Sequence, residues 1–246
     1  MSDGLAISAY GMDFDARRLG VIAQNVANST TTGFKKAILV SRPFADLLGI
    51  EAGAAGGAAA AAPASAPDIA TVTDFTQGTQ RSTGNPLDVA IEGNGFFELR
   101  EGDRVFYTRQ GTFRIDAGGR LVNEAGLTVS GSAGDITLTT AQPVIDARGR
   151  VSEAGKQVGE LRLVRVANPQ SLENLGSGLY AATDKTSVQP EASVQVRQGF
   201  LESSNVATMQ EMVRMIETMR HFEASQKVIQ AYDGILDKAI SKLGEF

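Results

Sequence analysis

Few side chains in this chain are able to do chemistry. Its only histidine is His221 and it has no cysteine, which excludes thiol catalysis, disulfides and zinc sites built on cysteine. His221 lies in METMRHFEASQK, a helical pattern that does not bring a nucleophile and an acid together with it. We therefore interpret His221 as a residue on the surface of a helix or in an interface.

The carboxylates of Asp88 and Glu92 in LDVAIEG could act as an acid and a base. They fall on the same face of an expected strand, but no second polar group accompanies them. We therefore interpret them as solvated strand side chains.

Two similar stretches, IDAGGRLVNEAG and IDARGRVSEAG, each predict a turn followed by a strand. In each turn an aspartate (Asp116 or Asp146) caps its own backbone, and a glycine (Gly119 or Gly149) takes the left-handed conformation. A calcium loop is the functional alternative, but the acidic residues needed at alternate ligand positions are lacking. No glycine-rich stretch continues into the Lys-Ser/Thr of a phosphate loop. We predict no catalytic residue, no cofactor and no metal site.

Composition is typical of soluble globular proteins, with 42% hydrophobic and 21% charged residues. A formal net charge of -5 leaves no basic surface for nucleic acid or anionic membranes. No apolar run approaches the roughly 18 residues needed to cross a bilayer, and the N-terminus lacks the pattern of a signal peptide. We expect no nucleic-acid partner and no membrane insertion. If the protein works outside the cytoplasm, we expect it to be exported without a cleaved signal peptide.

The N-terminal stretch predicts an amphipathic helix with a heptad pattern. Apolar residues recur with alternating spacings of four and three along one face. The residues of this N-terminal seam are Leu5, Ala9, Met12, Ala16, Leu19, Ala23 and Val26. Gly11 and Gly20 each weaken the helix by about 1 kcal/mol relative to alanine, so we expect it to need a partner.

A long helix is predicted from about residue 205 or 208 to the C-terminus. Its C-terminal seam follows the same spacing and consists of Met212, Met215, Met219, Phe222, Gln226, Ile229, Asp233, Leu236, Ile240 and Leu243. Both ends of the chain are therefore interpreted as coiled-coil formers and as the surfaces through which copies assemble.

The middle of the chain predicts β structure. Short alternating apolar runs separated by Gly, Asn or Asp turns extend from about 71 to 198, and the preceding stretch 52–67 contains only Ala, Gly, Pro and Ser. We predict an α+β fold in which N- and C-terminal coiled-coil helices form one helical layer and the middle domain is mainly antiparallel all-β.

The expected domains are the helical assembly layer at 1–35 and 205–246, a connecting segment with an Ala/Gly-rich linker at 36–70, and a β-rich domain at 71–204.

The stretch NVANSTTTGFKK, at the end of the first helix, is interpreted as a joint. Asn25 and Asn28 can bond the free backbone groups at the helix end, Gly33 permits a positive φ, and Phe34 anchors the exit. A plain solvated loop is the alternative, but it leaves Phe34 beside Gly33 unexplained.

The same stretch resembles the signature that follows the N-terminal helix in the bacterial flagellar rod and hook proteins. Three further segments resemble family motifs in the same order, namely NPLDVAIEGNGFFEL, YTRQGTFRIDAGGRLV and QGFLESSNV. With the two heptad ends, the resemblance covers nearly the whole chain. The Ala/Gly stretch departs from the family pattern.

The resemblance implies a non-enzymatic axial subunit of the basal body, located in the periplasmic rod. Its implied partners are copies of itself, other rod proteins and the flagellar type III export apparatus. Length and C-terminal sequence are most similar to the proximal-rod members. The distal-rod members share all four motifs and are the alternative.

Two alternatives come from other classes of protein. A secreted adhesin or coat protein shares the composition but not the motifs. A β-fold hydrolase would need clustered polar side chains.

Overall fold

The computed structural model describes residues 2–42, 68–183, 186–190 and 194–243, and the expected Ala/Gly-rich linker lies outside them. The chain divides into two compact units. The helical unit consists of Met1–Ala27, Ala37–Val72 and Ala207–Phe246, and the β unit of Asn28–Lys36 and Thr73–Val206. The domain boundaries expected from the sequence stay a prediction.

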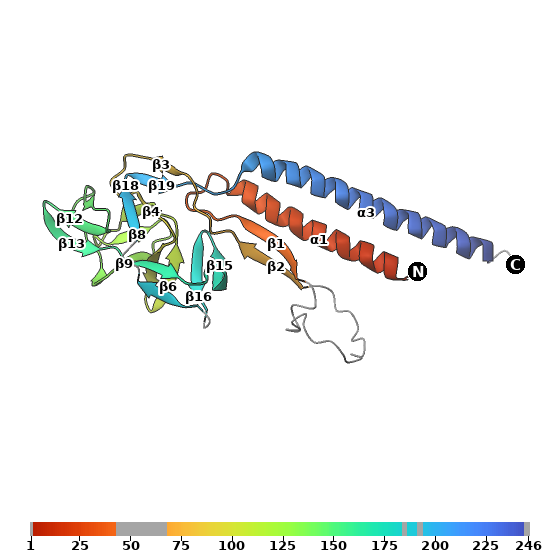
Figure 1. Ribbon diagram of the computed structural model, residues 1–246, viewed down its shortest axis with the longest axis horizontal. Helices are drawn as coiled ribbons and strands as arrows, with labels where there is room; N and C mark the ends of the chain where they lie inside the picture. The colour runs from red at the N-terminus through yellow and green to blue at the C-terminus, as the bar shows by residue number, and fades with distance from the viewer. Residues whose placement is uncertain (1, 43–67, 184–185, 191–193, 244–246) are drawn as a thin grey trace, which may run out of the picture. The chain divides into compact units, whose positions relative to one another are not determined.

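Two long helices dominate the helical unit. Helix α1 (Ser2–Ala27) and helix α3 (Thr208–Leu243) lie side by side and run in opposite directions (Figure 1). At 1.5 Å per residue, the 36 residues of α3 extend over about 54 Å. Strands β1 (Ala37–Arg42) and β2 (Asp68–Thr73) pair in a small sheet, and β1 contacts α1.

The β unit is built around a ten-stranded sheet whose paired strands run antiparallel. Along its main path the order is β15 (Leu172–Gly176), β16 (Leu179–Ala182), β6 (Arg104–Thr108), β5 (Phe96–Glu101), β9 (Thr128–Gly131), β8 (Leu121–Asn123) and β7 (Phe113–Ile115). The remaining members are β10 (Gly134–Asp135) on β9, β14 (Leu163–Val166) on β5, and β17 (Val188–Pro190) on β14.

Smaller elements complete this unit. They are the sheet β11 (Val144–Ile145), β12 (Arg150–Glu153) and β13 (Lys156–Glu160), the pair β4 (Val89–Glu92) and β18 (Gln195–Gln198), the pair β3 (Gln80–Ser82) and β19 (Phe200–Glu202), and the 3-10 turn η1 (Pro169–Ser171). The prediction of an α+β fold with a mainly antiparallel middle is confirmed, whereas coiled-coil packing of the helices stays a prediction.

Strand β5 separates two hydrophobic cores because successive side chains of a strand point to opposite faces. Phe97 and Leu99 lie in the larger core, and Phe96, on the other face, packs with Tyr107 and Tyr180 in the smaller one. This explains why the run GFFEL is apolar on both faces.

Both predicted aspartate turns are confirmed. Asp116 accepts hydrogen bonds from two backbone N–H groups within four residues, and Asp146 does the same. Gly119 and Gly149 have φ values of 80° and 82°, the left-handed conformation that such a turn requires. Since each aspartate also pairs with the arginine four residues later, the turns close on themselves.

Candidate assembly site

The predicted joint begins at Asn25, which lies near the end of α1 and is 1% exposed. Its side-chain amide donates to the carbonyl oxygen of Ala37 at 2.8 Å, and its Oδ1 accepts from the N–H of the same residue at 2.9 Å. Two hydrogen bonds to one residue fasten the start of β1 to α1 and satisfy a buried amide. The main partner of Asn25 is therefore the backbone of β1.

Asn28 closes a turn directly after α1. Its backbone carbonyl accepts from the N–H of Thr31 at 3.1 Å, and its Oδ1 accepts from the Thr31 hydroxyl at 3.2 Å. Such local bonds let Asn and Thr end a helix, because they compete with the continuing backbone pattern.

Gly33 occupies a position that is closed to other residues. Its φ is 65°, and a Cβ added there would lie 2.7 Å from the carbonyl carbon of Arg109 and from the backbone nitrogen of Gln110. Its own N–H donates to the backbone carbonyl of Glu202 at 2.7 Å. Glycine is needed both for the backbone angle and for this close approach.

Phe34 and Lys35 fix the remainder of the stretch within the β unit. Phe34 is 9% exposed, and its carbonyl accepts from the N–H of Asn205. The Nζ of Lys35 donates to Glu202 Oε1 at 2.5 Å and to the carbonyl of Thr76 at 2.7 Å. A fully buried ion pair thus joins the loop to the last strand of the unit.

Arg109 extends this charge cluster, with Nη1 3.6 Å from Glu202 Oε2. Burial lowers the pKa of Lys35 and of Arg109, and the negative charge of Glu202 opposes the shift in both. Sequence reasoning did not single out Glu202 or Arg109. For Lys35 and Glu202, the local signal was a charged residue placed beside apolar ones, in GFKK and GFLES.

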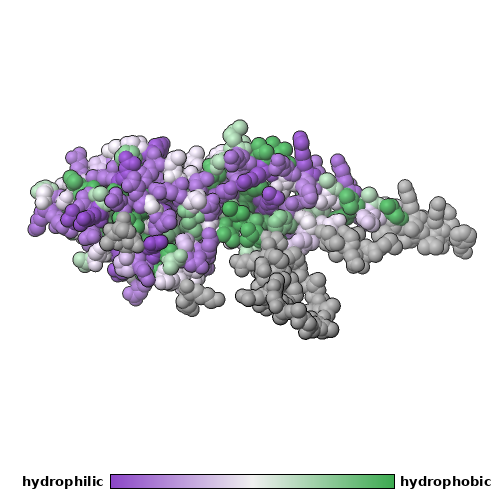
Figure 2. Space-filling view, viewed as in Figure 1, coloured by the Kyte–Doolittle hydropathy of each residue, from purple (hydrophilic) through white to green (hydrophobic). Residues whose placement is uncertain are grey.

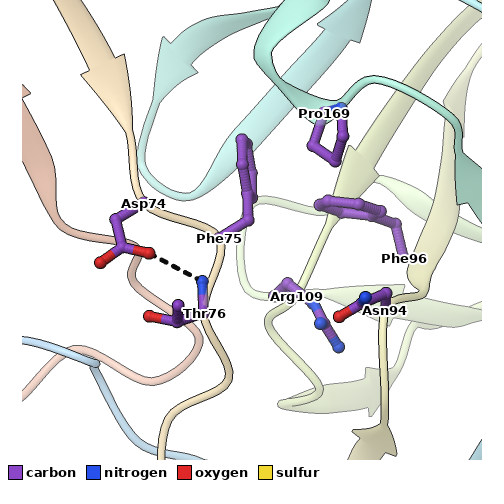
Figure 3. Close-up of a pocket in the computed structure, with 7 residues that line it drawn as sticks. All are labelled: Asp74, Phe75, Thr76, Asn94, Phe96, Arg109 and Pro169. Atoms are coloured by element: carbon purple, nitrogen blue, oxygen red, sulfur yellow. Dashed lines mark hydrogen bonds between the residues drawn. The ribbon is translucent and has the colours of Figure 1, made fainter.

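A pocket of about 290 Å³ lies beside this cluster (Figure 3). It is lined by Asp74, Phe75, Thr76, Asn94, Phe96, Arg109 and Pro169. The rings of Phe75 and Phe96 meet edge to face with their centroids 5.6 Å apart. Asp74 accepts from the N–H of Thr76, and Arg109 donates to the carbonyl of Gly93. These groups serve the fold, and the pocket brings together no nucleophile and base.

The interpretation of Asp88 as a solvated side chain is wrong. Asp88 is 5% exposed and accepts a hydrogen bond from the side-chain amide of Asn85 at 2.9 Å, whereas Glu92 is exposed as expected. The loop before β4 folds back over Asp88, which the local alternation of residues did not reveal.

The predicted seam residues do not all share one buried side of the helices. On α1, Met12, Leu19 and Val26 are half-buried, as are Met215, Phe222 and Ile229 on α3. Met212 and Met219 are 45% and 49% exposed. The side chains of Leu5, Leu236, Ile240 and Leu243 lie outside the described part of the structure.

The buried side of α3 instead alternates apolar and polar positions. It carries Glu211, Met215, Thr218, Phe222, Ser225 and Ile229, spaced by four and three residues. Glu211 and Thr218 are 2% and 3% exposed. The heptad spacing is therefore present, but the face in contact with α1 is rotated from the apolar seam that the sequence predicts.

Polar contacts set the register of the two helices. Asn25 of α1 donates to Glu211 of α3 at 3.4 Å. Asp15, ten residues earlier on α1, contacts His221, ten residues later on α3, as expected for antiparallel helices. Arg214 donates to Glu211 at 2.7 Å. The side chain of His221 is 69% exposed and contacts Asp15, so it lies on the helix surface at the edge of the helix pair, as the sequence predicts.

In the part of the chain that the structure describes, no three or more His, Cys, Asp or Glu side chains gather as metal ligands. The described helices include none with the length and hydropathy of a membrane span.

Two family models match the chain. The C-terminal region of the flagellar basal-body rod FlgEFG proteins matches residues 197–242, and the D1 domain of the flagellar hook FlgE/F/G proteins matches residues 90–153. These ranges contain Glu202, most of α3 and the centre of the main sheet.

Relatives extend the similarity to nearly the whole chain. The flagellar basal-body rod protein FlgF of Caulobacter vibrioides is 34% identical over 232 residues, which is 93% of each chain. FlgG of Agrobacterium fabrum is 34% identical over 93% of this chain and 95% of its own, and FlgG of Bacillus subtilis is 34% identical over 94% and 95%. Since full-length relatives align across both units, the chain belongs to the family of bacterial flagellar basal-body rod proteins.

Proposed function

We propose that this protein is a structural subunit of the proximal rod, FlgF-like in position, which polymerises through its terminal helices into the axial shaft. Its partners are copies of itself and other rod proteins. The flagellar type III apparatus exports it, and the rod holds it in the periplasm.

The observation that carries this proposal is the apolar surface left on α3. Of its apolar side chains, Met212, Ile216 and Met219 are 45%, 53% and 49% exposed although α1 already covers another side of the helix. Figure 2 shows hydrophobic surface at the beginning of this helix. A helix that is apolar on two sides is typical of one that receives a second partner.

Assembly is coupled to ordering of the ends. Helix α1 contains Gly11 and Gly20, which each weaken it by about 1 kcal/mol relative to alanine, and most helical stability in proteins comes from packing of the amphipathic face. We propose that the helix pair is only marginally stable in the dilute monomer and gains most of its stability when neighbouring subunits bury it, which limits polymerisation before export. Limited proteolysis of the dilute monomer should trim both ends and leave the β unit intact.

The joint supports the same role. Asn25 fastens β1 to α1, while Gly33, Phe34 and the Lys35–Glu202 pair hold the following loop to the β unit. We propose that this loop transmits force along the chain in the rod, because its backbone is held at each end by buried groups.

The test is a substitution on the exposed face of α3. Met212→Asp with Ile216→Asp should abolish incorporation into rods, counted by electron microscopy of basal bodies, and leave thermal unfolding of the monomer unchanged. Gln210→Asp with Gln230→Asp, on exposed polar positions of the same helix, is the control and should assemble normally. Normal motility of the apolar-face variant would rule out this face as the interface.

A distal-rod, FlgG-like position is the second candidate, because FlgG relatives match as well as FlgF does. The two differ in the stage at which assembly stops. Deletion of this chain should leave no rod beyond its base if it is proximal, and a short rod if it is distal. Electron cryotomography of the deletion strain distinguishes the two outcomes.

A further inference from the structure

Exposed apolar side chains in the first third of α3, residues 209–219, form a continuous stripe. They are Met209, Met212, Val213, Ile216 and Met219, each at least 45% exposed. At 3.6 residues per turn these positions fall within an arc of about 120°. The side that packs on α1, centred on Glu211 and Thr218, is on nearly the opposite face. We name this set the α3 outer stripe.

Helix α1 also presents an outer stripe, and it has the opposite character. Its exposed members are Ala9, Ala16, Gly20, Ala23 and Ala27, which fall within an arc of about 60°. The buried Asp15 and Ile22 lie on another side of the helix. The outer surface of α1 is thus flat along this line, because no side chain there is larger than a methyl group.

Within the described part of the subunit, no packing contact requires glycine at position 20. A Cβ at this position would meet no atom within 4 Å, and its conformation is that of an ordinary helix. Glycine there weakens α1 by about 1 kcal/mol relative to alanine. Glycine at such a position is favourable where a second helix packs against it, since no side chain then keeps the two backbones apart.

We propose that the α3 outer stripe of one copy packs on the α1 outer stripe of a second copy. The large, flexible methionine side chains then pack on the small residues of α1. Helices α1 and α3 would alternate from one subunit to the next, as they do within one subunit. The contact is heterologous, since two different surfaces meet, so it extends into an open array and does not stop at a dimer. This inference rests on the proposed function and adds which two faces meet.

Cross-linking tests the pairing directly, because the natural chain has no cysteine. A full-length Ala23→Cys chain and a full-length Ile216→Cys chain are mixed and treated with a short bis-maleimide. Cross-linked species should form between the two variants and remain scarce when either is treated alone. A dominant product from Ile216→Cys alone would show that α3 meets α3, and the proposal would be wrong.

A size change at Gly20 gives an independent test in sedimentation experiments. Gly20→Leu should weaken self-association of the full chain on the order of tenfold or more, since a large side chain blocks close approach. Gly20→Ala should associate like the natural chain, and both variants favour the helix, so a loss with leucine is not a failure to fold.

The outcomes separate this inference from the function on which it rests. If Met212→Asp with Ile216→Asp removes association but Gly20→Leu leaves it intact, the proposed pairing of the two stripes is wrong. Polymerisation through α3 would then still hold. A natural chain that shows no association at any concentration would overturn both.

Discussion

Replacement of Gly33 by alanine tests how the joint is held. In the structure a Cβ at this position lies 2.7 to 2.8 Å from three backbone atoms of Arg109 and Gln110, and backbone cannot move aside as a side-chain end can. The φ of 65° costs a residue other than glycine roughly 1–2 kcal/mol. Overpacking adds about 1–3 kcal/mol. We expect Gly33→Ala to lower the free energy of unfolding of the β unit by roughly 2–5 kcal/mol.

Urea unfolding of the full chain, followed by near-ultraviolet circular dichroism, measures this loss. The signal reports the β unit because Tyr107 and Tyr180 are buried in its smaller core. Gly84→Ala is the matched control, since Gly84 has a φ of 71° and no atom within 4 Å of an added Cβ. It should lose only the conformational part, roughly 1–2 kcal/mol.

Equal losses at the two positions would refute the role of close packing at Gly33. They would show that the loop moves away from Arg109 without cost, as a plain solvated loop can. A larger loss at Gly33, accompanied by fewer rods in cells that express the variant, would support the joint.

Three further changes test other parts of the structure. Lys35→Met leaves the carboxylate of Glu202 buried and should cost about 3 kcal/mol in urea unfolding, whereas Arg17→Met, in an exposed pair, should cost less than about 1 kcal/mol; equal effects would contradict the buried pair. Met215→Asp, on the α1-facing side of α3, should lower the helix content of the monomer in far-ultraviolet circular dichroism, an effect that the outer-face variants lack. Hydrogen bonds from two backbone N–H groups hold the pKa of Glu153 below its ordinary value, so near that value the folded state binds fewer protons than the unfolded state. Its contribution is present above about pH 4.3 and is lost as the pH falls through the lowered pKa, and Glu153→Gln should make the acid side of the stability profile shallower; an unchanged profile would refute this.

Local patterns in the sequence determined the classes of element. The repeating apolar positions predict both terminal helices, because a helix places residues three and four apart on one face. The turns at Asp116 and Asp146 were equally predictable, since their hydrogen bonds join atoms at most four residues apart. Alternating apolar runs predict the antiparallel β unit for the same reason, as each strand carries its own period of two.

Tertiary structure alone decided which faces meet and which polar groups are buried. Glu211 and Thr218 face α1 in place of the more apolar Met212 and Met219, because Asn25 and Arg214 bond Glu211 and thereby satisfy its burial. No periodicity in α3 encodes that choice, since the partner that makes it favourable lies at the other end of the chain.

The charge cluster of the joint follows the same logic. Lys35 and Glu202 are separated by 167 positions in the sequence, and each alone reads as a surface residue. Both side chains can be buried only when they contact each other and Lys35 also donates to the carbonyl of Thr76, since an unpaired charge in the interior costs free energy. A local pattern records what one segment prefers, whereas the stability of a buried charge depends on a partner that only the folded chain brings within reach.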